Sequence, residues 1–135
     1  VVKGRGSALD GKVVVDVSNA LTPDMKLALG FSTSGAEELQ KQAPKAKVVK
    51  AFNTQFAAHM QQGQVGDTAV TAFAAGDDKD AKATVLQLGK DLGFDMVDAG
   101  GHAAARYLEP LGMLNIHLGY VVGLGGDIGL RLVRK

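Results

Sequence analysis

The stretch Lys47-Val48-Val49-Lys50-Ala51-Phe52-Asn53-Thr54 decides the fold. It is a short β-branched run between Pro44 and a polar pair, and those bounds favour a buried strand over a helix. In an open parallel sheet, the groups just beyond the carboxyl ends of the strands face the ligand crevice. Asn53 and Thr54 are therefore candidate binding residues. The alternative is that they only cap the following segment, because their side chains accept hydrogen bonds from free helix N–H groups.

Three further segments have the pattern of strands, and two have the pattern of helices. We expect the strands at 12–17, 69–75 and 94–98, and the helices at 36–42 and 81–92. Ser34 and Glu37 have the spacing of a capping box at the start of the first helix. Strands that alternate with amphipathic helices are typical of an α/β fold with a parallel or mixed sheet.

Asn19 occupies the same place after the first strand that Asn53 occupies after the second. If both strands belong to one parallel sheet, their carboxyl ends meet at one edge. Asn19 is therefore a second candidate binding residue. Its alternative role is an Asx-turn that leads into Pro23.

After His102 the alternation gives way to one long helical pattern over 103–133, with an early break at Pro110 and many glycines. A helix that is apolar on most faces must be buried. A chain of 135 residues is too short to cover it unaided, so we expect a partner subunit or another part of a longer chain to pack against it. The pattern divides the chain into an α/β unit at 1–101 and a helical segment at 102–135.

Composition argues against several functional classes. The chain has 15 Lys and Arg against 14 Asp and Glu, a formal net charge of +1, so nothing favours a nucleic-acid partner. The absence of cysteine excludes disulfides and Cys-based zinc sites and fits a cytoplasmic protein. The longest apolar-rich run, 111–124, is shorter than the roughly 20 residues of a membrane span, so we expect no membrane partner. The start Val1-Val2-Lys3 has neither Met nor a signal region, which suggests the interior of a longer chain.

Motifs for common catalytic mechanisms are incomplete or missing. Gly123-Leu124-Gly125-Gly126-Asp127-Ile128 departs from G-x-G-x-x-G at Ile128 and follows an apolar helix, so we interpret it as a packing feature. No phosphate loop, zinc helix or nucleophile triad is found, and no metal site is predicted. Hydride transfer needs none of these, because the cofactor carries the chemistry and the protein supplies orientation and water exclusion.

Five motifs together resemble one known family. They are Val15-Asp16-Val17-Ser18-Asn19, Val49-Lys50-Ala51-Phe52-Asn53-Thr54, Ala75-Gly76-Asp77-Asp78, Val97-Asp98-Ala99-Gly100 and Ala105-Arg106-Tyr107-Leu108-Glu109-Pro110-Leu111. In this order they resemble the later part of the coenzyme F420-dependent NADP oxidoreductase family. The dinucleotide-binding module of that family is also similar to the reductase domain of the STEAP metalloreductases. The resemblance runs from about Gly11 to the end of the chain.

The resemblance implies the later part of a Rossmann-like NADP-binding domain at 1–101, and a segment at 102–135 for the deazaflavin pocket and homodimer formation. It implies hydride transfer between NADP and coenzyme F420, or a related flavin such as FMN or FAD. The residues it assigns to the two cofactors are Asn53, Thr54, Gln55 and Ala57 for the flavin-type ring, Asn19 for the nicotinamide side, and Leu111 and Gly112 for the deazaflavin pocket. Small residues near a ring do not distinguish F420, a flavin and a ferric chelate as acceptor.

The sequence departs from that family at one important point. The glycine-rich loop and the basic residues that hold the 2′-phosphate of NADP belong to the family's first strands, and they are missing from this sequence. The pyrophosphate then has no helix N-terminus of the usual kind. The alternative function is a non-catalytic fragment or assembly module that self-associates through its C-terminal helix.

Overall fold

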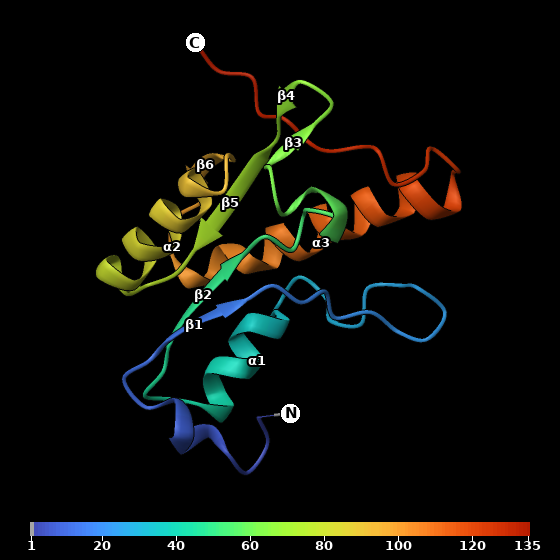
Figure 1. The fold of residues 1–135 in the computed structure, drawn as a ribbon. Helices are drawn as coiled ribbons and strands as arrows, with labels where there is room; N and C mark the ends of the chain where they lie inside the picture. The colour runs from blue at the N-terminus through green and yellow to red at the C-terminus, as the bar shows by residue number, and fades with distance from the viewer. Residues whose placement is uncertain (1) are drawn as a thin grey trace.

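The computed structural model describes residues 2–135, which form a four-stranded mixed sheet, a two-stranded hairpin and helices on both sheet faces (Figure 1). The spatial order of the main sheet is β1, β2, β5, β6. These strands are β1 Val13–Asp16, β2 Lys47–Ala51, β5 Thr71–Ala75 and β6 Asp95–Asp98. The predicted α/β fold class is confirmed. Val1, the first residue of the predicted α/β unit, lies outside the described residues.

The direction of the strands decides which turns meet. β1 is parallel to β2 and β5 is parallel to β6, but β2 and β5 are antiparallel. The carboxyl ends of β1 and β2 therefore share one edge with the amino end of β5. The turns that contain Asn19 and Asn53 lie at that edge, whereas the turns after β5 and β6 lie at the opposite one.

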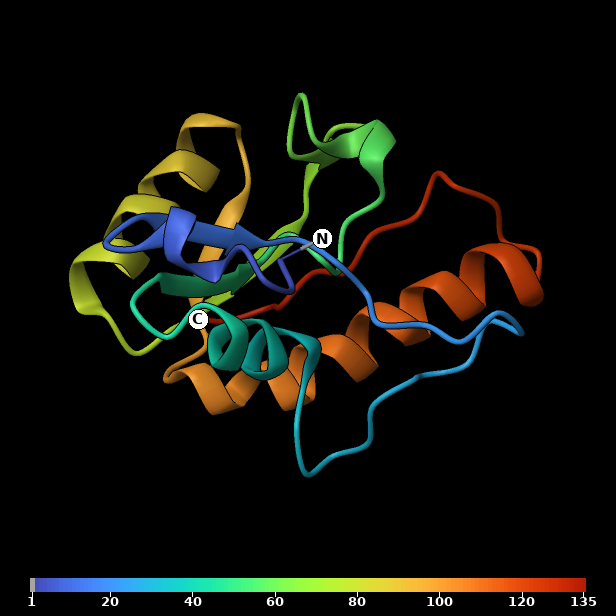
Figure 2. The same ribbon diagram turned by 90° about the horizontal axis from the view of Figure 1, so that it is seen from below.

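Three α-helices cover the sheet: α1 Gly35–Gln42, α2 Lys79–Asp91 and α3 Ala105–Ile116. Side chains alternate between the faces of a strand. Val49 and Ala51 of β2 accordingly pack in the core under α2, while Val48 packs in a smaller cluster with α1. Figures 1 and 2 show α2 on one side of the sheet and α1 with α3 on the other.

Local sequence signals account for the helix ends. The Ser34 hydroxyl accepts a hydrogen bond from the Glu37 N–H at 3.1 Å, which confirms the predicted cap of α1. Asp78 caps α2 through the Ala81 N–H at 2.8 Å. Gly93, with φ +94°, follows the end of α2, because glycine adopts this left-handed conformation at little cost.

The helix predicted over 103–133 is shorter than expected. α3 continues through Pro110 and extends as a π-helical turn over His117–Val121, so the prediction is wrong beyond Val121. Gly123 and Gly125 then take φ +91° and +83°, which turns the chain away from the helix axis. The remaining residues run back as an extended tail to the start of β5, where Thr71 N–H donates to the Leu130 carbonyl at 2.9 Å (Figure 1).

Short elements complete the described residues. β3 Gln64–Val65 and β4 Thr68–Ala69 form an antiparallel hairpin. Single 3-10 turns are found at Gly6–Leu9, Ala57–His59 and His102–Ala104. Within residues 2–135, no helix has the length and apolar character needed to cross a membrane.

Candidate functional site

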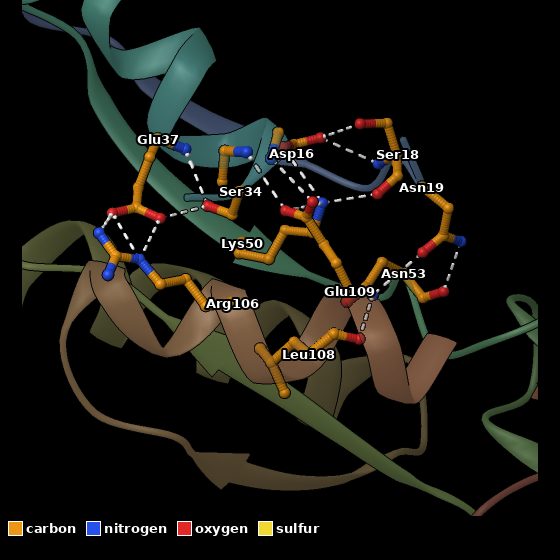
Figure 3. A network of polar contacts seen from close by, with 12 residues as sticks. Asp16, Ser18, Asn19, Ser34, Glu37, Lys50, Asn53, Arg106, Leu108 and Glu109 are labelled. Atoms are coloured by element: carbon orange, nitrogen blue, oxygen red, sulfur yellow. Dashed lines mark hydrogen bonds and ion pairs between the residues drawn. The ribbon is translucent and has the colours of Figure 1, made fainter. Parts of the chain in front are cut away.

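A pair of asparagines joins the turns after β1 and β2. The Asn19 amide donates to the Asn53 carbonyl at 2.8 Å, and the Asn53 amide donates to Asn19 Oδ1 at 3.2 Å (Figure 3). The Asn53 amide also donates to the Leu108 carbonyl of α3 at 2.8 Å. The Asn53 side chain is buried, with only 3% of its surface exposed. Its hydrogen bonds therefore join β1, β2 and α3.

Gly112 allows α3 to approach this pair closely. A Cβ atom at position 112 would lie 2.6 Å from Asn19 Oδ1 and 2.8 Å from Asn53 Nδ2. Such contacts are shorter than van der Waals packing allows, so glycine is required for this fit. The structure therefore brings Asn19, Asn53 and Gly112 together; the resemblance assigned Asn19 to the nicotinamide side, and Asn53 and Gly112 to the flavin-type ring.

The alternative roles of the strand-end residues are wrong. The next helical element along the described residues is the 3-10 turn Ala57–His59. No side chain caps it, so Asn53 and Thr54 are not capping residues. Thr54 instead accepts hydrogen bonds from Gln55 Nε2 at its hydroxyl and from Asn115 Nδ2 at its carbonyl. Asn19 Oδ1 accepts from Asn53 rather than forming an Asx-turn. A binding role for these residues remains a prediction.

Phe52, the first residue after β2, has a strained backbone. Its φ of 62° is left-handed, a conformation that costs a non-glycine residue about 1–3 kcal/mol. The turn is held by the Gln55 N–H, which donates to the Phe52 carbonyl at 3.2 Å, and by the Asn19 bond to Asn53. Strain of this kind concentrates at binding and active sites. Residue type did not predict it, because phenylalanine rarely takes this conformation.

An apolar pocket lies beside the strained turn. It measures about 190 Å³ and is lined by Val17, Phe52, Gln55, Ala57 and Met60. The Gln55 amide is fixed because its Nε2 donates to the Thr71 carbonyl at 2.8 Å. Ligand pockets commonly combine apolar walls with a few fixed polar groups. The predicted residues Gln55 and Ala57 thus share one pocket, next to the asparagine pair.

Leu111 is placed elsewhere. It lines a second pocket of about 290 Å³, between α3 and the C-terminal tail, together with Phe73, Leu130, Arg131 and Leu132. Consecutive residues on a helix point in different directions, and Leu111 points toward the tail while Gly112 lies against the asparagine pair. The structure does not bring Leu111 to the asparagine pair.

Lys50 is a buried residue of the site that our residue-based predictions missed. It has no exposed surface, and its ammonium lies 3.2 Å from Asp16 Oδ2, 3.2 Å from Glu109 Oε2 and 2.5 Å from the Ser18 carbonyl (Figure 3). A buried charge is costly unless it is paired, so a lysine within an apolar strand signals nearby carboxylates. Asp16 is opposite Lys50 in the β1–β2 register.

The N-terminus of α1 is filled by a carboxylate from α3. Glu109 accepts hydrogen bonds from Gly35 N–H at 2.7 Å and Ala36 N–H at 3.3 Å. A free helix N-terminus can bind phosphate, but here the chain's own carboxylate occupies it. The N-terminus of α2 lies at the opposite sheet edge. Within residues 2–135, the edge of the sheet that carries Asn19 and Asn53 therefore has no unoccupied N-terminus of α1 or α2.

Two ion pairs fasten the elements around the site. Arg106 of α3 donates hydrogen bonds from Nε and Nη2 to the Glu37 carboxylate of α1. This guanidinium holds the pKa of the Glu37 carboxyl below its usual value. Arg134 of the tail binds Asp95 at the start of β6 and lowers the pKa of that carboxyl. Neither pair lines the pocket beside Phe52, so we assign both pairs to stability.

Comparisons with known proteins identify relatives over most of the chain. No protein-family model matches it. Metalloreductase STEAP3 of Rattus norvegicus is 40% identical over 103 residues, which is 76% of this chain and 20% of STEAP3. Metalloreductase STEAP2 of Homo sapiens is 30% identical over 116 residues, 84% of this chain and 22% of STEAP2. The chain thus spans about a fifth of the length of these relatives.

A solved structure of a proposed F420-dependent NADP-reductase from Arthrobacter sp. FB24 matches with a TM-score of 0.88 and 31% identity. The match covers 97% of this chain and 61% of that chain. The relationship predicted from the sequence is confirmed. A hypothetical protein from Sinorhizobium meliloti matches with a TM-score of 0.63 and 38% identity, over 71% of this chain and 48% of that one. The Rossmann-like architecture is therefore shared with the Arthrobacter reductase.

Proposed function

We propose that this chain is the nicotinamide-proximal part of a cytoplasmic, NADP-dependent oxidoreductase. Its reaction would be hydride transfer between NADP(H) and coenzyme F420 or a related flavin-type acceptor. The observation that carries the proposal is the strained Phe52 turn, which Asn19 holds beside an apolar pocket. The similarity to an F420-dependent NADP-reductase and to metalloreductases supports the same reaction class.

The protein's part in such a reaction is to orient the rings and exclude water. A bound NADPH would supply the hydride from its nicotinamide ring. Val17, Ala57 and Met60 offer apolar contacts to a flat ring, and Gln55 offers an amide that is already held by Thr71. Preformed contacts of this kind lower the barrier by fixing the approach of the reacting atoms. Asn53 would act indirectly, because its side chain is buried in the turn.

The phosphates of NADP would be bound by residues outside this sequence. Glu109 already occupies the α1 N-terminus, and an added phosphate would meet its negative charge. We therefore expect the 135-residue chain to bind NADPH weakly, through the nicotinamide end.

The acceptor can be tested by following NADPH oxidation with F420, FMN and a ferric chelate in parallel, using a longer chain that includes the phosphate site.

The experiment for the pocket is a titration of the chain with NADPH, followed by nicotinamide fluorescence. Ala57→Phe should fill the pocket and abolish saturable binding at unchanged thermal stability, because Ala57 is exposed at its rim. Ala8→Phe is the matched control, since Ala8 is also exposed and lines another apolar pocket of about 190 Å³. Equal binding by the wild-type chain and the Ala57→Phe variant would refute the proposed site.

The surface of α3 favours a second candidate function, self-association. Along α3 and the π-helical turn that follows it, apolar residues recur at alternating spacings of four and three, at Tyr107, Leu111, Leu114, Leu118 and Val121; Leu111 and Leu118 are half-buried and the other three are exposed. Tyr107 is 73% exposed, Leu114 48% and Val121 61%. Such a stripe is typical of a helix that packs against another helix. We propose that a second copy of the chain covers it to form a homodimer, with or without the catalytic role.

This assembly can be tested by sedimentation. Leu114→Lys places a charge in the centre of the stripe and should convert dimer to monomer. Leu88→Lys in α2 is the control, because Leu88 is 47% exposed but lies outside the stripe. A wild-type chain that sediments as a monomer at all concentrations would exclude this second function.

A further inference from the structure

The ammonium of Lys50 is fully paired although it is buried. It can donate three hydrogen bonds, and its three neighbours are Asp16, Glu109 and the Ser18 carbonyl. The remaining carboxylate oxygens are also occupied. Asp16 Oδ1 accepts from Ser18 N–H at 2.9 Å and from the Ser18 hydroxyl at 2.6 Å. The α1 N-terminus supplies the donors for Glu109.

Stability alone does not explain such a cluster. Buried ion pairs often add no net stability compared with apolar residues of similar size. Two of the three charges converge on one residue, because Lys50 and Asp16 together bind the carbonyl, N–H and hydroxyl of Ser18. Ser18 directly precedes Asn19, which donates to the Asn53 carbonyl. The cluster therefore fixes the segment that carries Asn19 (Figure 3). We use the term crevice for the Asn19–Asn53 pair together with the pocket beside Phe52.

We propose that Lys50 is a positioning residue for the nicotinamide crevice: through Ser18, it holds Asn19 against the Phe52–Gln55 turn before any ligand binds. This role rests on the proposed function of the crevice. It also couples α3 to the crevice, because Glu109 reaches Lys50 from that helix while Leu108 accepts from Asn53. Lys50 itself would not touch the cofactor, since it has no exposed surface.

The test uses a charge-matched double variant, Lys50→Met with Asp16→Asn. The cluster has one cation and two carboxylates in the wild type, and the variant keeps one carboxylate, so the net charge of −1 is unchanged. Asparagine at 16 can still accept from Ser18, and only the ammonium contacts are lost. The control is Glu37→Gln with Arg106→Gln, which removes an ion pair between α1 and α3 away from Ser18.

Two readouts separate positioning from simple stabilisation. The first is the nitrogen-15 NMR signal of the Asn19 side-chain amide and its protection from hydrogen exchange. In the folded double variant we expect this signal to move and its protection to fall, with no change in the control. The second is NADPH affinity, which should weaken about tenfold in the double variant, as expected for a crevice that loses a charged hydrogen bond.

An Asn19 amide signal at the wild-type position in the double variant would overturn the proposal, as would an equal change in the control. If the wild-type chain does not bind NADPH, the proposed function fails while the NMR readout still decides the role of Lys50. Lys50→Arg provides a second variant if the double variant does not fold. It keeps the charge, but a planar guanidinium cannot place donors in the same three directions, so the Asn19 signal should still move.

Discussion

Substitution of Gly112 by alanine is the sharpest perturbation of the crevice. The added methyl carbon would lie 2.6 Å from Asn19 Oδ1, 2.8 Å from Asn53 Nδ2 and 2.9 Å from the Asn53 carbonyl. Because one of these atoms belongs to the backbone, rotation of a side chain cannot relieve every contact. Either α3 moves outward or the asparagine pair separates, and both changes reach the pocket beside Phe52.

The magnitude follows from two opposing terms. Alanine stabilises a helix interior by about 1 kcal/mol relative to glycine. Overpacking by one methyl group in a tight interior costs about 1–3 kcal/mol. We therefore expect Gly112→Ala to lower the free energy of unfolding by about 1 kcal/mol, which corresponds to a decrease in Tm of about 4 °C.

The assay pairs thermal unfolding with the NADPH titration. Gly89→Ala in α2 is the control, because the atoms nearest its methyl would be Cγ, Sδ and Cε of the flexible Met96 side chain, on the other face of the sheet. NADPH affinity should fall in Gly112→Ala and stay unchanged in Gly89→Ala. If Gly112→Ala raises Tm and binds NADPH as the wild type does, the close approach of α3 to the asparagine pair is refuted.

Two further predictions concern the polar contacts. Asn53→Leu removes the amide that donates to the Leu108 carbonyl and to Asn19 Oδ1, so we expect a loss of about 1–3 kcal/mol in chemical denaturation, and an unchanged stability would contradict the buried role of Asn53. Arg134 lowers the folded-state pKa of Asp95, so the stabilisation of the tail by this pair is fully present above the unfolded value of about 3.9. It is lost as the pH falls from there through the lower folded-state pKa. The Leu132 amide, which donates to Thr71, should then lose hydrogen-exchange protection on acidification, and Asp95→Asn should show the reduced protection already at pH 7.

The strands of the main sheet, the helix caps and the meeting of two turns could be predicted from local sequence, whereas the β3–β4 hairpin was missed. β-branched runs, a capping residue and a glycine after a helix each act within a few positions, so their consequences can be seen in a short stretch. The shared edge of Asn19 and Asn53 followed from one rule about parallel strands. Gly112 at that edge came from the resemblance to a known family.

The contacts that make the crevice could not be predicted in this way. The fit of Gly112 against Asn19, the partners of Lys50 and the strain at Phe52 all depend on how α3 packs on the sheet. A local pattern does not contain that packing. The predicted helix over 103–133 failed for a related reason, because apolar residues after Gly123 pack as an extended tail against β5 rather than as helix.

We propose that the carboxyl edge of β1 and β2 binds the nicotinamide end of the dinucleotide, and that no residue at this edge binds its phosphates. The most direct test is nitrogen-15 NMR of the chain titrated separately with reduced nicotinamide mononucleotide and with 2′,5′-ADP. We predict that the mononucleotide shifts the backbone amides of Ser18, Asn19, Gln55 and Ala57, and that 2′,5′-ADP shifts none of them. Unchanged amides with the mononucleotide, or shifts at these residues with 2′,5′-ADP, would contradict the claim.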